Sequence, residues 1–253
     1  MPTDYARFLT GRTRTVAANR QLGFVLAFVA GAINAGGFLA VQQYTSHVTG
    51  MVSALADNLA LGRFGLVVDA AVGVLAFLLG AISCAVMVNF ARRKGMASEY
   101  ALPLLVEAAL ILCFGLAGAR MSGYEGLLVP FTVVLLCFIM GLQNAVMTKL
   151  SNAVIRTTHL TGIVTDLGIE IGKLLYWNHA HTHGVDVHAD RDRMAVLATL
   201  LVSFLAGGVT GAFGFKYLGY VSTVPLAILL AALAIVPLFD DLKRVGLAFH
   251  ERR

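Results

Sequence analysis

The chain has 253 residues, of which 58% are hydrophobic and only 13% are charged, and its mean hydropathy is +0.80. Ordinary soluble domains carry roughly 25% charged residues, so this composition excludes a soluble domain and indicates an all-α integral membrane protein. The formal net charge of +5 needs no nucleic-acid partner, because the placement of Lys and Arg relative to the apolar segments accounts for it.

The first half begins with a basic segment, residues 1–20, which we predict to be cytoplasmic. Gln21 to Ala56 then contains no charged residue, which is longer than the about 20 residues that one crossing needs. We therefore predict a transmembrane helix followed by a shorter segment. Across the first half, residues 21–120, the predicted spans are 22–41, 67–90 and 101–119.

The second half, residues 121–240, repeats this organisation and is followed by a cytoplasmic tail, residues 241–253. Its apolar runs lie on either side of a long hydrophilic stretch that includes a His-rich loop, residues 178–190. The predicted spans are 126–149, 194–215 and 218–239.

Orientation follows from the basic residues. If the N-terminus is cytoplasmic, only Arg63, Arg120 and Lys216 of the 19 Lys and Arg residues lie outside. This asymmetry obeys the positive-inside rule and predicts that both termini of the six-helix protein are cytoplasmic.

Three short motifs occur in the same order in both halves. Gly31-Ala-Ile-Asn-Ala35 matches Gly141-Leu-Gln-Asn-Ala145, TSHVTG at 45–50 matches TTHLTG at 157–162, and Leu61-Gly-Arg63 matches Ile171-Gly-Lys173. Each half has an odd number of spans, so the second copy must cross the membrane in the opposite direction. We predict two inverted three-helix repeats, an architecture typical of secondary transporters.

The segment after each hexapeptide is predicted to be a re-entrant or half-helix. About 12 residues after TSHVTG give roughly 18 Å, which reaches about halfway across a core of roughly 30 Å. A Thr or Ser is expected to cap each helix, and the two helix starts are expected to face each other across a pseudo-two-fold axis. The predicted substrate-binding residues are Asn34, His47, Thr49, Gly50, Asn144, His159, Thr161 and Gly162.

Four carboxylates are predicted to act in gating or coupling. Asp166 and Glu170 lie four residues apart on one face of the second short helix, Asp57 lies in the first, and Glu107 interrupts an apolar span, where ionisable groups are functional by default. The alternative for Glu107 is a place near the inner end of its span from which it reaches water. For the two hexapeptides, the alternative is interfacial polar residues and helix caps.

The His-rich loop offers His179, His181, His183 and His188 as ligands for a divalent metal. Their spacing is not that of a closed zinc site, so a solvated loop is the alternative.

The sequence contains no phosphate-binding loop, no dinucleotide fingerprint, no HExxH and no GxSxG. We therefore expect neither an enzyme nor an ATP-driven pump, and no cofactor. A secondary transporter or channel for a small polar solute, anionic solutes included, is the favoured function. A divalent-metal transporter, an intramembrane enzyme and a non-transporting sensor or scaffold stay open.

The same motifs, GAINA, TSHVTG, GLQNA and TTHLTG, resemble the bacterial YoaK family of uncharacterised membrane proteins over residues 20–240. The resemblance implies location in the bacterial inner membrane and no established activity. Many members have Asp where this chain has Asn34 and TGN where it has Thr49-Gly50-Met51, so the resemblance does not support proton coupling at position 34. The expected partners are membrane lipid and a small-molecule or ion substrate, and a homo-oligomer is left open.

Overall fold

The computed structural model describes residues 15–96, 99–120, 125–150, 160–176 and 187–250, without the side chains of 125–127, 236–237 and 240–250. Every regular element in these ranges is helical. The long helices are α2 (Val16–Val41), α4 (Phe64–Arg93), α5 (Ala101–Ala119), α6 (Glu125–Leu150), α8 (Arg191–Leu218) and α9 (Thr223–His250). The short elements are α3 (Val48–Ala60), α7 (Leu160–Leu175) and the 3-10 turn η2 (Gly219–Ser222).

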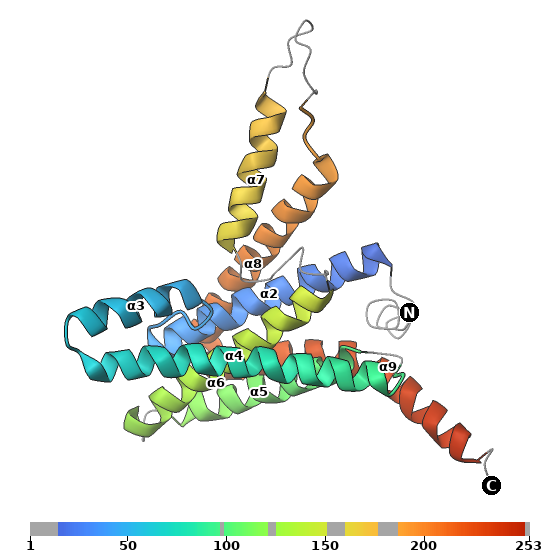
Figure 1. The fold of residues 1–253 in the computed structure, drawn as a ribbon. Helices are drawn as coiled ribbons and strands as arrows, with labels where there is room; N and C mark the ends of the chain where they lie inside the picture. The colour runs from blue at the N-terminus through green and yellow to red at the C-terminus, as the bar shows by residue number, and fades with distance from the viewer. Residues whose placement is uncertain (1–14, 97–98, 121–124, 151–159, 177–186, 251–253) are drawn as a thin grey trace, which may run out of the picture.

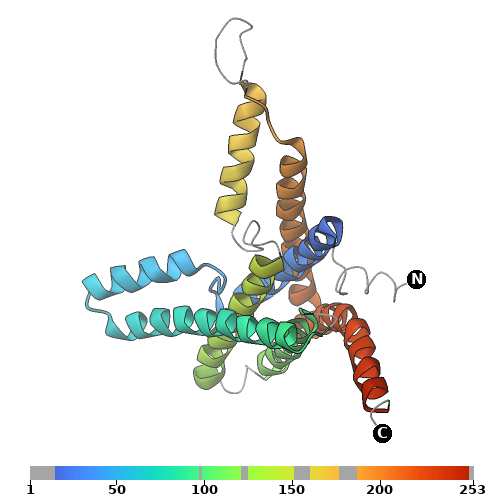
Figure 2. The ribbon, with the colours of Figure 1, turned by 45° about the vertical axis from the view of Figure 1, so that its right-hand side comes forward.

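Helices α2 and α6 cross at the centre of the molecule and run antiparallel. The Asn19 side-chain amide donates to the Leu150 carbonyl at 3.2 Å, and further along α2 the Gln143 amide donates to the Leu26 carbonyl at 3.2 Å. Helix α8 packs on α2, α4 packs on α6, and α5 pairs with α9. Two hairpins, α3–α4 and α7–α8, project from this body in different directions (Figures 1 and 2).

The α2–α8 and α4–α6 crossings are built in the same way. A Cβ atom on Gly31 of α2 would collide with the Phe204 carbonyl of α8, and one on Gly207 of α8 would collide with the Phe28 carbonyl of α2. The other crossing has the same reciprocal contacts. Each helix thus contributes one Phe-x-x-Gly unit, and the units are Phe28–Gly31, Phe77–Gly80, Phe138–Gly141 and Phe204–Gly207.

Both short helices begin against the middle of a central helix. Met51, in the first turn of α3, is 4% exposed and clusters with Cys137, which is at the midpoint of the 26-residue α6. Ile163, in the first turn of α7, clusters with Ala27, close to the midpoint of the 26-residue α2. Each short helix therefore begins on the central helix of the other half of the chain.

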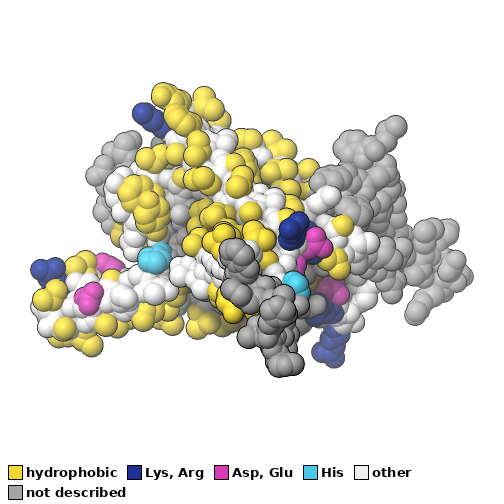
Figure 3. All heavy atoms as spheres, turned by 90° about the horizontal axis from the view of Figure 1, so that it is seen from above, with side chains coloured by type: hydrophobic (Ala, Val, Ile, Leu, Met, Phe, Trp, Pro, Cys, Tyr) yellow, Lys and Arg dark blue, Asp and Glu magenta, His cyan; other side chains and the backbone are white. Residues whose placement is uncertain are grey.

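The surface of the long helices is apolar. Helix α4 buries small residues on one face and exposes Leu75, Leu79, Ile82 and Val86 on the opposite face at helical spacing, each about half exposed. Figure 3, a view from above Figure 1, shows hydrophobic side chains over much of the described surface and only a few small groups of charged ones. An apolar outer face is expected for helices that contact lipid.

Five helical runs in the described residues are long and apolar enough to cross a membrane: Val16–Val41, Phe64–Arg93, Ala101–Ala119, Leu128–Leu150 and Arg191–Ile235. The protein is thus helical, with the length and composition of a multi-pass membrane protein. The last run includes α8, η2 and the start of α9, with a bend at Gly219, whose φ is +63°.

Each predicted span coincides with observed helix, except that the last one, 218–239, begins at the final residue of α8 and continues through η2 into α9. The predicted cap of the first short helix is wrong. His47 is the N-cap of α3 and makes no side-chain capping bond. Thr45 is buried and the Ser46 hydroxyl is bound to Asn34, so neither hydroxyl is placed to cap the helix.

Candidate functional site

The first hexapeptide folds back onto the end of α2. The chain leaves α2 through Gln42, which adopts a left-handed conformation with φ 54°. The Ser46 hydroxyl then donates to the Asn34 side-chain oxygen at 2.7 Å. The Tyr44 ring stacks on Phe38 with a centroid separation of 4.6 Å. Asn34 of α2 therefore lies beside the first hexapeptide.

His47 lies at the start of α3 and its side chain is exposed. Its ring packs over Gly50, where a Cβ atom would collide with it, so the glycine gives the imidazole room to lie against the first turn. Thr49 is exposed in the same turn, and Asp57 is exposed near the other end of α3.

Only part of the second hexapeptide falls among the described residues. Thr161 and Gly162 lie in the first turn of α7, as predicted, whereas His159 lies outside the described residues. Asn144 is buried and its amide donates to the Met140 carbonyl at 2.8 Å within α6.

The carboxylates Asp166 and Glu170 hold α7 against the start of α8. Asp166 pairs with the Arg193 guanidinium at 2.9 Å. One Glu170 oxygen accepts from Lys173 and the other from the backbone N–H of Asp190, each at 2.9 Å. The Lys173 side-chain bond and the Asp190 backbone bond lower the pKa of the Glu170 carboxyl below its usual value. Both carboxylates therefore have a structural role in this conformation.

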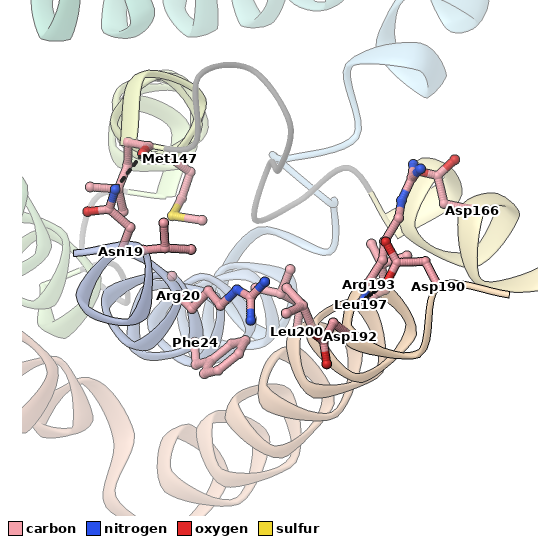
Figure 4. A pocket seen from close by; sticks show the side chains of 14 residues that line it. Asn19, Arg20, Phe24, Met147, Asp166, Asp190, Asp192, Arg193, Leu197 and Leu200 are labelled. Carbon is pink, nitrogen blue, oxygen red and sulfur yellow. Dashed lines mark hydrogen bonds and ion pairs between the residues drawn. The ribbon is translucent and has the colours of Figure 1, made fainter. Parts of the chain in front are cut away.

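A cavity of about 470 Å³ opens between the first half of α2, the end of α6, α7 and the start of α8 (Figure 4). This volume is within the range of small-molecule sites, about 300–1,000 Å³. Of its 14 lining residues, seven have apolar side chains and one is Gly23. The polar ones are Asn19, Arg20, Asp166, Asp190, Asp192 and Arg193.

The polar lining combines both signs of charge. Arg193 is engaged by Asp166, and Asp190 accepts a hydrogen bond from the Arg193 backbone N–H as the N-cap of α8. Arg20 and Asp192 have no ion pair with another described residue. Figure 4 shows the Arg20 guanidinium extending from α2 toward α8.

Sequence reasoning found one of these polar residues, Asp166, and missed the others. Arg20 and Arg193 were counted only as signals of membrane orientation. Their approach depends on the packing of α8 beside α2, which lie far apart in the sequence. The one available local signal was Asp190, an Asp directly before an apolar run, which is typical of a helix N-cap.

The remaining predicted residues lie elsewhere. Glu107 is completely buried in α5, which contributes no residue to the cavity lining. Of the proposed metal ligands, His188 is exposed just before α8, whereas His179, His181 and His183 lie outside the described residues. No group of three or more His, Cys, Asp or Glu suited to a metal ion occurs within the described ranges.

The family model for a protein of unknown function (DUF1275) matches residues 22–236. The chain therefore belongs to this family, and the match covers both matched halves. No curated protein and no solved structure matches the chain.

Proposed function

We propose that this member of the DUF1275 family is a secondary transporter of a small polar solute, built from two inverted repeats of three membrane-spanning helices. In this proposal the first repeat contains α2 to α5 and the second contains α6 to α9. The cavity between α2, α6, α7 and α8 is the access route from the cytoplasmic side.

The reciprocal contacts support the inverted repeats. The matched glycines Gly31 and Gly141 lie on α2 and α6, which run antiparallel and face partners in equivalent ways. Two copies of one unit related by a two-fold axis in the membrane plane would place their first helices antiparallel in this manner. A span of 45 residues, Arg191–Ile235, is about 68 Å of helix, which is enough for two crossings of a core of roughly 30 Å.

The starting points of the short helices support a site near the midplane. Met51 and Ile163 place the first turns of α3 and α7 against the middles of α6 and α2. The first backbone N–H groups of a helix have no intrahelical partner, so a helix that begins at membrane depth offers them to a polar solute. The residues proposed to contact the solute are Asn34, His47, Thr49, Gly50, Asn144, His159, Thr161 and Gly162.

The cavity is the single observation that carries the proposal. It reaches inward from the charged ends of α2 and α8 to Gly23 and Leu200, and α7 is its movable wall. Helix α7 contacts the helical body through its first turns, and it contacts the start of α8 through the carboxylates Asp166 and Glu170. We propose that movement of α7 with its hairpin opens and closes this route, as in alternating access.

A ligand screen by thermal unfolding tests the function. Full-length protein in detergent is heated with small carboxylic acids, amines, amino acids, sugars and Zn²⁺, because binding to the native state raises the apparent stability. We expect one solute class to raise the Tm, and Arg20→Gln to remove the shift. Arg63→Gln, at the far end of the α3–α4 hairpin, is the matched control and should keep it.

The stabilising solute is then tested for uptake into proteoliposomes. Uptake by the wild type that is lost in Arg20→Gln supports the transporter. Binding without uptake would favour a sensor, a shift by Zn²⁺ alone would favour the divalent-metal alternative, and a shift unaffected by Arg20→Gln would exclude this cavity as the route.

A further inference from the structure

A carboxylic acid is buried in α5, a helix that contributes no residue to the lining of the cavity. Glu107 lies on α5, six residues after Ala101, and its exposed fraction is 0%. Neither carboxyl oxygen has a hydrogen-bond partner among the described residues. Its neighbours along the same face of α5 are apolar and buried: Leu104, Ala108 and Ile111.

The charged and titratable groups around Glu107 do not neutralise it. Cys84 of α4 is close enough to Glu107 for their charges to interact, and Lys149 of α6 is close enough to Cys84 for the same. No described Lys or Arg forms an ion pair with Glu107. The described side chains of α9 between 223 and 235 include no titratable group, and Tyr220 of η2 packs at the opposite end of α5, against Gly118.

An ionised carboxylate in such a place is strongly disfavoured. Removing a charge from water without a paired cation or hydrogen-bond donor costs so much free energy that the group takes up a proton instead. Burial of the protonated acid costs less free energy, because a neutral polar group loses only its hydrogen bonds to water. Burial of the whole side chain with both oxygens unpaired therefore implies a proton on Glu107.

We propose that Glu107 is a proton-binding site, protonated in this conformation and able to release its proton when α5 shifts from α4 and α6 and admits water. Glu107 lies about 9 Å along α5 from its first residue, so the shortest exit is toward the end of the bundle that carries Lys149. Proton binding by Glu107 does not depend on the protein being a transporter, whereas use of the proton to drive transport rests on the proposed function.

Dicyclohexylcarbodiimide, an apolar reagent for protonated carboxyl groups, tests the site on full-length protein. The acid transfers its proton to a carbodiimide nitrogen while its oxygen bonds to the central carbon, and the acyl group then migrates to nitrogen. The adduct is stable, and no group leaves. We expect peptide mass spectrometry to find it on Glu107, and the labelling rate to fall as the pH rises.

Matched variants define the result. Glu107→Gln keeps the shape of the neutral acid, so it should fold and lose the adduct. Glu170→Gln, which removes a paired carboxylate, should leave labelling of Glu107 unchanged. The infrared spectrum gives a second measurement, because a protonated carboxyl in an apolar site has its own C=O stretching band, which should be absent from Glu107→Gln.

The outcomes separate the two ideas. If Glu107 is not labelled and the infrared band is the same in the wild type and in Glu107→Gln, the proton site is excluded. If both signals are present but solute uptake does not respond to a pH gradient, the proton site stands and its coupling to transport is excluded. If only the solute screen fails, the proposed function is rejected, and carbodiimide labelling still decides whether Glu107 binds a proton.

Discussion

At the scale of single residues, backbone contact between helices depends on glycine. Lipid tails are as apolar as leucine side chains, so helices in a membrane associate through close packing rather than through the hydrophobic effect. A glycine brings the Cα atom of one helix against a carbonyl oxygen of the next, which also permits weak Cα–H···O contacts. The reciprocal contacts at Gly31 and Gly207 therefore fix both the distance and the relative position of α2 and α8.

Gly207→Ala should destabilise the protein because its methyl group would meet backbone atoms of Phe28, which cannot rotate away. Overpacking of this kind costs about 1–3 kcal/mol. The control is Gly172→Ala in α7, where a Cβ atom meets nothing within 4 Å, and helix propensity favours Ala by up to about 1 kcal/mol. Thermal unfolding in detergent measures both changes. Equal Tm values for Gly207→Ala and the wild type would contradict the close crossing.

At the scale of the helices, the sequence predicted where the elements lie but not what they contact. Charged residues bound the apolar runs, so the ends of α5 and α6 were predicted within a residue. Helical periodicity indicates which face is buried but not which helix covers it. For this reason the pairing of α2 with α8 and the cavity lining at Arg20 could not be predicted, whereas Glu107 could be noticed as one charge in an apolar run.

The cap of α3 shows a second limit. Threonine and serine near a helix start favour a side-chain cap in any sequence, yet here a contact 12 residues away takes the Ser46 hydroxyl to Asn34. Tertiary contact overrides local preference, and the sequence contains no separate signal for it.

The attachment of α7 to α8 should depend on pH. The folded-state pKa of Glu170 lies below its ordinary value of 4.5, so its contribution to stability is fully present above that value. The contribution is lost as the pH falls through the lower, folded-state pKa. The distance between spin labels placed on α7 and on α8 should therefore increase as the hairpin opens below about pH 4.5.

Glu170→Gln should remove this pH dependence and loosen the hairpin at neutral pH. Asp166→Asn is the matched control, because the pair of Asp166 with Arg193 is more than a third exposed and exposed pairs contribute at most about 1 kcal/mol. An unchanged pH response in Glu170→Gln would show that Glu170 does not hold α7.

At the scale of the whole molecule, the positions of the two hairpins relative to α2 distinguish the two ends of the helical bundle. The α3–α4 hairpin projects beyond the end of α2 (Figures 1 and 2). In the α7–α8 hairpin, the start of α8 lies beside the start of α2, where both line the cavity. In the proposed inverted repeat these are opposite sides of the membrane. The skewed distribution of Lys and Arg supports the same assignment, with Arg63 outside.

Cysteine labelling from each side of the membrane tests this arrangement. The native Cys84, Cys113 and Cys137 are first replaced with alanine, and single cysteines are introduced at Arg63 and Gly172, which are both exposed. In intact cells an impermeant maleimide should label Arg63→Cys and leave Gly172→Cys unlabelled, and in inside-out vesicles the pattern should reverse. Arg63 comes just after α3 and Gly172 lies near the end of α7, so the two positions are nearly matched in the duplicated segments. Opposite labelling is what an odd number of spans per repeat requires. Labelling of both cysteines from one side would exclude the inverted repeat, and with it the idea that α3 and α7 approach a shared midplane site from opposite faces.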